Sequence, residues 1–301
     1  MRRPFVKSRS AISPAKLSKR YALNREIKMS ELSELITNQM RTLICDATED
    51  PNIKLNNGLR LLAKWRSLLI QNTLLEKNGV GVLQGPLKGL NFVEQSSEGC
   101  HVAKLLGCYE QPLQPYLLRA INRNYGTLIN IGCAEGYYAV GLAVAMPNTN
   151  SLAFDTDENA QKACADLAKK NGVADRVKIG KHFNIQKFAD YESHNALVLC
   201  DIEGAERDLL DPIKAPALSN LDIIVESHEC LVRGITEELT RRFSSSHNII
   251  RVNDNGQRSL EEAPKWFAEM AHLDQLLATW EWRSGPTPWL VMDAKNKKEL
   301  E

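Results

Sequence analysis

The sequence lacks the features by which several classes of protein are identified. Its seven cysteines include no Cys-x-x-Cys pair, and an odd, unpatterned set of thiols favours a reducing, cytoplasmic compartment. No apolar run reaches the roughly 18 residues needed to cross a membrane, and nothing at the N-terminus resembles the apolar region of a signal peptide. The formal net charge is only +1, which gives no general argument for nucleic-acid binding.

The composition is that of a soluble enzyme with one sizeable domain and a smaller appendage. Of the 301 residues, 43% are hydrophobic and 25% are charged. Residues 1–28 are basic and poor in acids, and we interpret them as a disordered leader. An organelle-targeting peptide and a contact with an anionic surface are the alternatives.

Residues 29–78 are predicted to form a helical cap or lid on the main domain, which spans residues 79–301. Apolar residues recur at helical spacing from Ser30 to about Cys45 and from Asn57 to about Leu75. A cap packed on the main domain is the structural interpretation. A substrate lid or a homo-oligomer interface formed by these helices is the functional alternative.

The most informative stretch is residues 127–146. An apolar run from Leu128 to Ile131 indicates a buried parallel strand, which breaks at Gly132 and resumes after Gly136 as a helix that stops before Pro147. Such a strand–glycine–helix turn is expected to leave backbone N–H groups free and to let a ligand approach the chain, as in nucleotide-binding folds. An ordinary glycine turn in an α/β domain is the alternative.

The spacing of the glycines argues against a dinucleotide. The fingerprint G-x-G-x-x-G would need glycine where Ala134 and Tyr137 stand. About 20 residues after the turn, a second apolar strand ends in Asp155, which is placed to accept hydrogen bonds from ribose hydroxyls. Ribose recognition without a diphosphate loop indicates an adenosyl ligand such as S-adenosylmethionine.

Two further apolar strands each end in ionisable residues. The strand 196–200 leads into Asp201 and Glu203, and the strand 221–225 leads into Glu226 and His228. In open α/β sheets the carboxyl ends of the strands form the edge at which ligands bind. We therefore expect these four side chains at the functional site.

These strings together resemble one family. They are Asn130-Ile-Gly-Cys-Ala-Glu-Gly-Tyr-Tyr138, Ala153-Phe-Asp155, Asp201-Ile-Glu-Gly-Ala-Glu206 and Val225-Glu-Ser-His228. The chain resembles class I S-adenosylmethionine-dependent methyltransferases, in particular the FkbM type, over roughly residues 79–294. It departs from that family where Asn130 replaces the usual acid and where Asp155 replaces the commoner Glu, but both keep a hydrogen-bond acceptor.

The resemblance implies a set of contacts to S-adenosylmethionine. It places Tyr109 and Glu110 over the cofactor pocket and the loop 182–184 near the adenine ring. The residues expected at the cofactor are Glu110, Asn130, Gly132, Cys133, Glu135, Gly136, Asp155, Asn184 and Asp201. A helix N-terminal turn is the structural interpretation of Glu110.

The expected chemistry is methyl transfer to a hydroxyl of a small molecule or saccharide. His228 is the candidate base, because imidazole titrates near neutrality. Asp201, Glu203 and Glu226 would orient it, bind the acceptor or, with His228, hold Mg²⁺ or Mn²⁺. The structural alternatives are that Asp201 caps the following helix and that His228 is a core residue.

The element pattern predicts a Rossmann-like, doubly wound α/β fold with a mostly parallel seven-stranded sheet and an N-terminal helical extension. A hairpin is expected at 80–93 around a Gly85-Pro86 turn. A single helix is expected from about Pro264 to Trp280, between the last two strands. Cys133, Cys164 and Cys200 are predicted to be small apolar core residues rather than nucleophiles.

Two other function classes remain open from the sequence. A nicotinamide-dependent oxidoreductase could use a similar sheet, although the missing third glycine counts against it. A catalytically silent adenosyl-binding module could interact with a partner through residues 1–78. No Asn/Asp-Pro-Pro-Tyr string follows the fourth strand, which argues against nucleic acid as the methyl acceptor.

Overall fold

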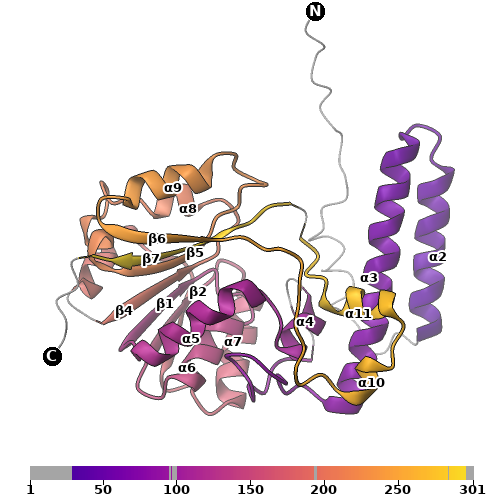
Figure 1. Ribbon diagram of the computed structural model, residues 1–301, viewed down its shortest axis with the longest axis horizontal. Helices are drawn as coiled ribbons and strands as arrows, with labels where there is room; N and C mark the ends of the chain where they lie inside the picture. Colours follow the sequence, from indigo (N-terminus) through magenta and orange to yellow (C-terminus); the bar gives the residue numbers. More distant parts are fainter. Residues whose placement is uncertain (1–28, 95, 97–99, 193–194, 284, 296–301) are drawn as a thin grey trace, which may run out of the picture.

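A computed structural model describes residues 29–94, 96, 100–192, 195–283 and 285–295. Its centre is a seven-stranded sheet in the order β3-β2-β1-β4-β5-β7-β6 (Figure 1). Only β7 runs antiparallel to its neighbours, β5 and β6. The strands are β1 (Thr127–Ile131), β2 (Asn150–Phe154), β3 (Val177–Gly180), β4 (Ala196–Cys200), β5 (Asp222–Glu226), β6 (His247–Val252) and β7 (Trp289–Ala294). The predicted fold class is confirmed, whereas the basic leader at 1–28 lies outside the described residues.

Helices cover both faces of the sheet. The helices α5 (Gln114–Arg123), α6 (Tyr137–Ala145) and α7 (Glu158–Lys170) lie on one face (Figure 1). The opposite face carries α8 (Glu206–Leu209), α9 (Ile235–Phe243) and the 3-10 helices η2 (Ile185–Tyr191) and η3 (Pro216–Asn220). Alternate residues of the central strands β1, β4 and β5 enter the two cores, as Leu128 does on one side and Ile129 on the other. This two-sided burial explains why these strands are apolar without alternation.

The N-terminal helices form an antiparallel pair at one end of the molecule (Figure 1). Helix α2 (Met29–Cys45) packs on α3 (Pro51–Asn78), which in turn packs on α4 (His101–Leu106) and α11 (His272–Thr279). Helix α3 begins six residues before the predicted start, because the Asp50 carboxylate accepts the N–H groups of Asn52 and Ile53. No helix in the described part of the chain is both long and apolar enough to cross a membrane.

The predicted hairpin at 80–93 forms, but the length of its strands is wrong. Its two arms pair through hydrogen bonds from the N–H of Val82 to the carbonyl of Leu90 and from the N–H of Phe92 to the carbonyl of Val80, around a single antiparallel bridge between Gly81 and Asn91. The predicted turn is present, since the N–H of Lys88 donates to the carbonyl of Gly85. The N–H of Leu83 donates to the carbonyl of Leu105 on α4, and the positive φ of Gly85 and Gly89 interrupts the extended conformation. The segment is therefore a short hairpin whose turn is held against α4.

The single helix predicted from Pro264 to Trp280 is also wrong. Two short helices occupy the segment, α10 (Lys265–Ala268) and α11, and Ala271 between them is extended, with ψ 142°. The side-chain amide of Gln275 donates to the carbonyls of Phe267, Ala268 and Met270 at the end of α10 and in the break. That side-chain bond allows the chain to turn where the apolar period alone predicts continuity.

Candidate functional site

The strand order changes direction between β1 and β4, and the chain is tightly packed at that point. Strands β2 and β3 follow on one side of β1, and β4 and β5 on the other. Gly132, directly after β1, has φ 81°, and a Cβ there would lie 1.6 Å from the backbone oxygen of Asp201. Gly136 has φ 94°, and its Cβ would lie 2.7 Å from Sγ of Cys164 on α7. Both glycines are thus required by packing within the protein.

Four backbone donors of the turn after β1 are engaged within the protein. Gly132 and Cys133 both donate to the carbonyl of Phe154, at 2.8 and 3.0 Å. The N–H of Ala134 donates to Oδ2 of Asp155 at 2.9 Å, and that of Gly136 to the carbonyl of Cys133. These four N–H groups are therefore not available to a diphosphate.

Asp155 lies at the end of β2 with acceptor capacity to spare. Its Oδ2 accepts from Ala134 and its Oδ1 from the N–H of Asp157 at 2.8 Å. A carboxylate offers about four lone-pair positions, so two backbone bonds leave room for two hydroxyl groups. The side chain is partly exposed and is held rigidly between two turns. This arrangement fits the expected ribose contact.

Asn130 is the second acceptor at this edge. It is 1% exposed, and its Nδ2 donates to the carbonyl of Leu199 at 3.3 Å. Its Oδ1 is buried and has no hydrogen-bond partner among the described residues. Buried acceptors without partners are rare, and a donor group on a bound ligand would satisfy this one.

Three other residues expected at the cofactor have structural partners. Glu135 is fully buried in an ion pair with Lys104, Oε1 to Nζ 2.7 Å. Asn184 is exposed, and its side chain caps η2 by accepting the N–H of Gln186. Cys133 is 4% exposed, and its contact with Cys164 together with burial raises its thiol pKa. With Cys164 and Cys200 also buried, the prediction of core thiols is confirmed.

Four carboxylates surround His228, and together they form what we call the acid cluster: Asp201, Glu203, Glu206, Glu226 and His228. Its Nδ1 lies 2.9 Å from Oε1 of Glu206. Its Nε2 lies 3.5 Å from Oδ1 of Asp201 and 3.6 Å from both Oε2 of Glu203 and Oε2 of Glu226. The structure thus brings together all four residues predicted at the strand ends.

The charges of this cluster shift its titration. Burial disfavours the imidazolium of His228, but the hydrogen bond that its Nδ1–H donates to Glu206 and the neighbouring carboxylates outweigh it, so the pKa is raised. Burial and the nearby Glu226 raise the pKa of Asp201 well above its ordinary value. The same two causes, burial first, raise the pKa of Glu110 to about 7. Clusters of perturbed groups in this position are candidates for function.

Arginine side chains tie the cluster to the C-terminal part of the chain. Arg283 donates to Glu226, to Oε1 of Glu110 at 2.7 Å and to Oε2 of Glu281 at 3.1 Å. Tyr138 donates its hydroxyl to the other oxygen of Glu110. Arg283 and Tyr138 therefore hold the carboxylate of Glu110 beside the acid cluster.

Sequence reasoning missed Glu206, Arg258, Glu281 and Arg283. Glu206 lies in the quoted Asp201–Glu206 string, and its recurrence three residues after Glu203 was the available signal. The other three lie in loops, where no periodicity marks them. The alternative that Asp201 caps the next helix is wrong, since Ala205 occupies the N-cap of α8 and no side chain caps it.

No family model matches the sequence, and no curated protein matches it. Among solved structures, the O-methyltransferase TomG from Streptomyces achromogenes with bound S-adenosylmethionine matches at 16% identity and TM-score 0.37, covering 48% of this chain and 73% of that one. The precorrin-6y C5,15-methyltransferase from Geobacter metallireducens matches at 13% identity and TM-score 0.37, covering 60% and 87%. Fibrillarin from Methanococcus jannaschii, a pre-rRNA processing protein, matches at 9% identity and TM-score 0.37, covering 64% and 73%. Likeness this distant carries no argument about activity, which has to come from the site.

Proposed function

We propose that this protein is an S-adenosylmethionine-dependent methyltransferase that methylates a hydroxyl of a small molecule or saccharide. The proposal rests mainly on His228, which is surrounded by carboxylates and lies beside the point where the strand order reverses. Open α/β sheets bind their ligands at this position. The cluster comes from the ends of β4 and β5, next to the turn after β1. The resemblance to the FkbM type supports the same assignment and is part of the proposal.

The acceptors at the β1–β2 edge fit an adenosyl ligand with an amine. Asp155 would accept the ribose hydroxyls, and Oδ1 of Asn130 would accept a hydrogen bond from a donor on the cofactor. Gly132, Cys133 and Gly136 would shape the adjoining backbone. The occupied N–H groups of this turn favour S-adenosylmethionine over a nicotinamide dinucleotide, whose diphosphate needs free donors. When bound, S-adenosylmethionine supplies an electrophilic methyl group.

His228 would take the proton from the acceptor hydroxyl. Its Nδ1 is anchored on Glu206, which leaves Nε2 to face Asp201, Glu203 and Glu226. A base held through its other ring nitrogen keeps a fixed orientation and tautomer. In this interpretation the three carboxylates around Nε2 stabilise the imidazolium formed by proton transfer.

The same side chains have the composition of a divalent-cation site. Ligand atoms of Asp201, Glu206 and His228 all lie within 4.8 Å of one another. Oε2 of Glu206 is buried and has no hydrogen-bond partner among the described residues, so a bound cation or a hydrogen-bond donor would stabilise it. Asp201, Glu203, Glu226 and His228 would hold Mg²⁺ or Mn²⁺, with Glu206 orienting the histidine. A bound ion would supply Lewis-acid stabilisation of the acceptor oxygen.

Turnover of S-adenosylmethionine to S-adenosylhomocysteine tests the proposal. We expect product with a hydroxylated acceptor and a large loss in His228→Ala. His272→Ala is the matched control, because His272 is exposed on α11, outside the cluster. A chelator that abolishes activity, with recovery on Mg²⁺ or Mn²⁺, would assign the proton step to a metal site; full activity in chelator would assign it to His228 alone. Equal turnover in both histidine variants together with no chelator effect would contradict the site.

The proposal extends to the N-terminal helices and to the cell compartment. Residues 79–301 would form the methyltransferase domain, and residues 29–78 a helical cap that also serves as a homo-oligomer surface. Leu55 and Leu59 of α3 are 64% and 67% exposed, which suits a contact between copies. All seven cysteines are free, as expected in a reducing cytoplasm. Light scattering of the protein with and without Leu55→Ser and Leu59→Ser tests the oligomer.

A further inference from the structure

A cavity of about 480 Å³ lies beyond the acid cluster, at the C-terminal side of the sheet. Its walls come from the loop after β6, from α11 and from the loop that precedes β7. The residues that matter for its chemistry are Asp254, Arg258, Trp280, Glu281, Arg283 and Thr287. Its volume falls within the roughly 300–1,000 Å³ of typical small-molecule pockets.

The sheet topology places this cavity next to the proposed reaction centre. Glu226 at the end of β5 pairs with Trp289 at the start of β7, so the loop before β7 continues the ligand edge. Arg283 lines the cavity and donates to Glu226, which is 3.6 Å from His228. From Asp155 onward the edge therefore runs from the cofactor acceptors through the acid cluster to the cavity. That order fits an acceptor facing a methyl donor across the cluster.

The two arginines that line the cavity, Arg258 and Arg283, already form ion pairs with carboxylates. Arg258 bonds to Oδ2 of Asp254 at 2.7 Å and, through Nε, to Oε1 of Glu281 at 2.8 Å. Arg283 bonds to Glu110, Glu226 and Glu281. A phosphate or carboxylate on the acceptor would have to displace one of these carboxylates and leave it buried without a partner, which is costly. The charges thus select against anionic acceptors.

The remaining wall combines apolar and hydroxyl-binding groups. Trp280, Pro286 and Pro288 supply apolar surface, and Asn253 and Thr287 supply neutral polar groups. An aromatic face with a few converging polar groups suits a ring that is apolar on one face and hydroxylated at its edge.

We propose that this cavity binds the methyl acceptor as an uncharged, polyhydroxylated ring compound, a neutral saccharide in chemical class, and that Trp280 contacts its apolar face. The inference rests on the proposed methyltransferase function and assigns its acceptor site. Arg283 is a positioning residue, because it joins the cavity to Glu226 through its own hydrogen bonds.

The test uses the full chain with S-adenosylmethionine and a panel of methyl glycosides, the corresponding sugar phosphates and the corresponding uronic acids. We expect S-adenosylhomocysteine only with the neutral members. Trp280→Ala should raise KM for the best of them about tenfold or more, with Trp280→Phe recovering most of the loss and the affinity for S-adenosylmethionine unchanged.

Trp266→Ala is the matched control, since Trp266 donates to Asn78 on α3 and does not line the cavity. Three results would overturn the acceptor assignment. The first is turnover confined to phosphorylated or carboxylated members, and the second is no turnover with any neutral member while S-adenosylmethionine still binds. The third is an equal change of KM in the two alanine variants. Failure of the unmodified protein to bind S-adenosylmethionine would instead overturn the proposed function.

Discussion

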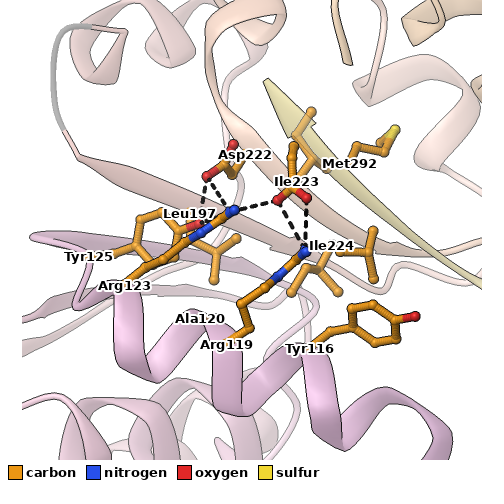
Figure 2. Close-up of a pocket in the computed structure, with 12 residues that line it drawn as sticks. Tyr116, Arg119, Ala120, Arg123, Tyr125, Leu197, Asp222, Ile223, Ile224 and Met292 are labelled. Carbon is orange, nitrogen blue, oxygen red and sulfur yellow. Dashed lines mark hydrogen bonds and ion pairs between the residues drawn. The ribbon is translucent and has the colours of Figure 1, made fainter. Parts of the chain in front are cut away.

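Charged clusters lie at both ends of the parallel strands, and they differ in their balance. At the amino ends, Asp222 and Asp293 face Arg119 and Arg123, with the hydroxyl of Tyr125 on Asp222 at 2.6 Å (Figure 2). Two carboxylates meet two guanidinium groups there, and the space between them is only about 10 Å³. In this cluster the positive and negative charges are balanced.

At the carboxyl ends the carboxylates exceed the cations. Asp201, Glu203, Glu206 and Glu226 surround His228, and Arg283 is shared among several acids. Natural proteins rarely bury like charges without a counter-charge, because the cost exceeds the gain from packing. A balanced cluster of this kind stabilises the fold, whereas a surplus of carboxylates at the ligand edge suits the binding of a cation or a proton donor.

The largest effect on activity is expected from the removal of the imidazole of His228. General-base loss lowers turnover by about 10²–10⁴-fold, so His228→Ala should lose activity on that scale while binding S-adenosylmethionine nearly as before. Steady-state kinetics and calorimetry measure the two effects. If turnover is retained, the carboxyl-edge cluster is structural, like its counterpart at the amino ends.

The converse change is Asp222→Ala at the amino ends. It leaves the hydroxyl of Tyr125 and the N–H of Ala294 without their acceptor, whereas Arg123 keeps its ion pair with Asp293. Leaving a buried donor unsatisfied costs about 1–3 kcal/mol of unfolding free energy. Urea unfolding measures that loss, and the turnover of the folded fraction should stay unchanged. Arg119→Ala is the control, because that side chain is 36% exposed and should cost about 1 kcal/mol or less. A loss of turnover in folded Asp222→Ala would show that the two clusters are not separate in role.

Asp155→Ala probes the cofactor end of the same edge. It removes a charge-assisted contact to ribose and should weaken S-adenosylmethionine binding by about 1.5–3 kcal/mol. Asp157→Ala is the matched control: Asp157 caps α7 through the N–H of Asn159, so its loss should lower stability by about 1 kcal/mol without changing affinity. Calorimetry that finds equal affinities in the two variants would remove the ribose role.

The smallest effect is expected from deleting residues 1–28. Their basic bias and lack of apolar period predict that a chain starting at Met29 keeps its specific activity. Methyl-transfer assays on both chains measure this. A loss greater than about fivefold would place part of the leader in the catalytic machinery.

The sequence predicts the centre of the sheet well because its strands are continuous apolar runs buried on both faces, as in Leu128–Ile131 and Ala196–Cys200. It also predicts the residues at the strand ends, since Asp201 follows β4 directly and His228 lies just beyond β5. It fails where a single side chain redirects the backbone, as Gln275 does at the break between α10 and α11.

The partners of the site residues were beyond prediction for a different reason. Arg283 reaches Glu226 across 57 residues of sequence and Glu110 across 173. No local pattern encodes such pairings, because they depend on how loops return to the sheet edge. In the same way, the glycines of the first turn suggested an open ligand loop, whereas Gly132 serves the close approach of Asp201.

The most direct measurement asks whether the protein binds S-adenosylmethionine rather than a nicotinamide dinucleotide. It is isothermal calorimetry of the full chain with S-adenosylmethionine and, separately, with NAD. The occupied turn donors, the acceptor oxygens of Asn130 and Asp155, and the adjoining acid cluster predict saturable binding of S-adenosylmethionine and none of NAD. Binding of NAD, or of neither ligand, would contradict the account.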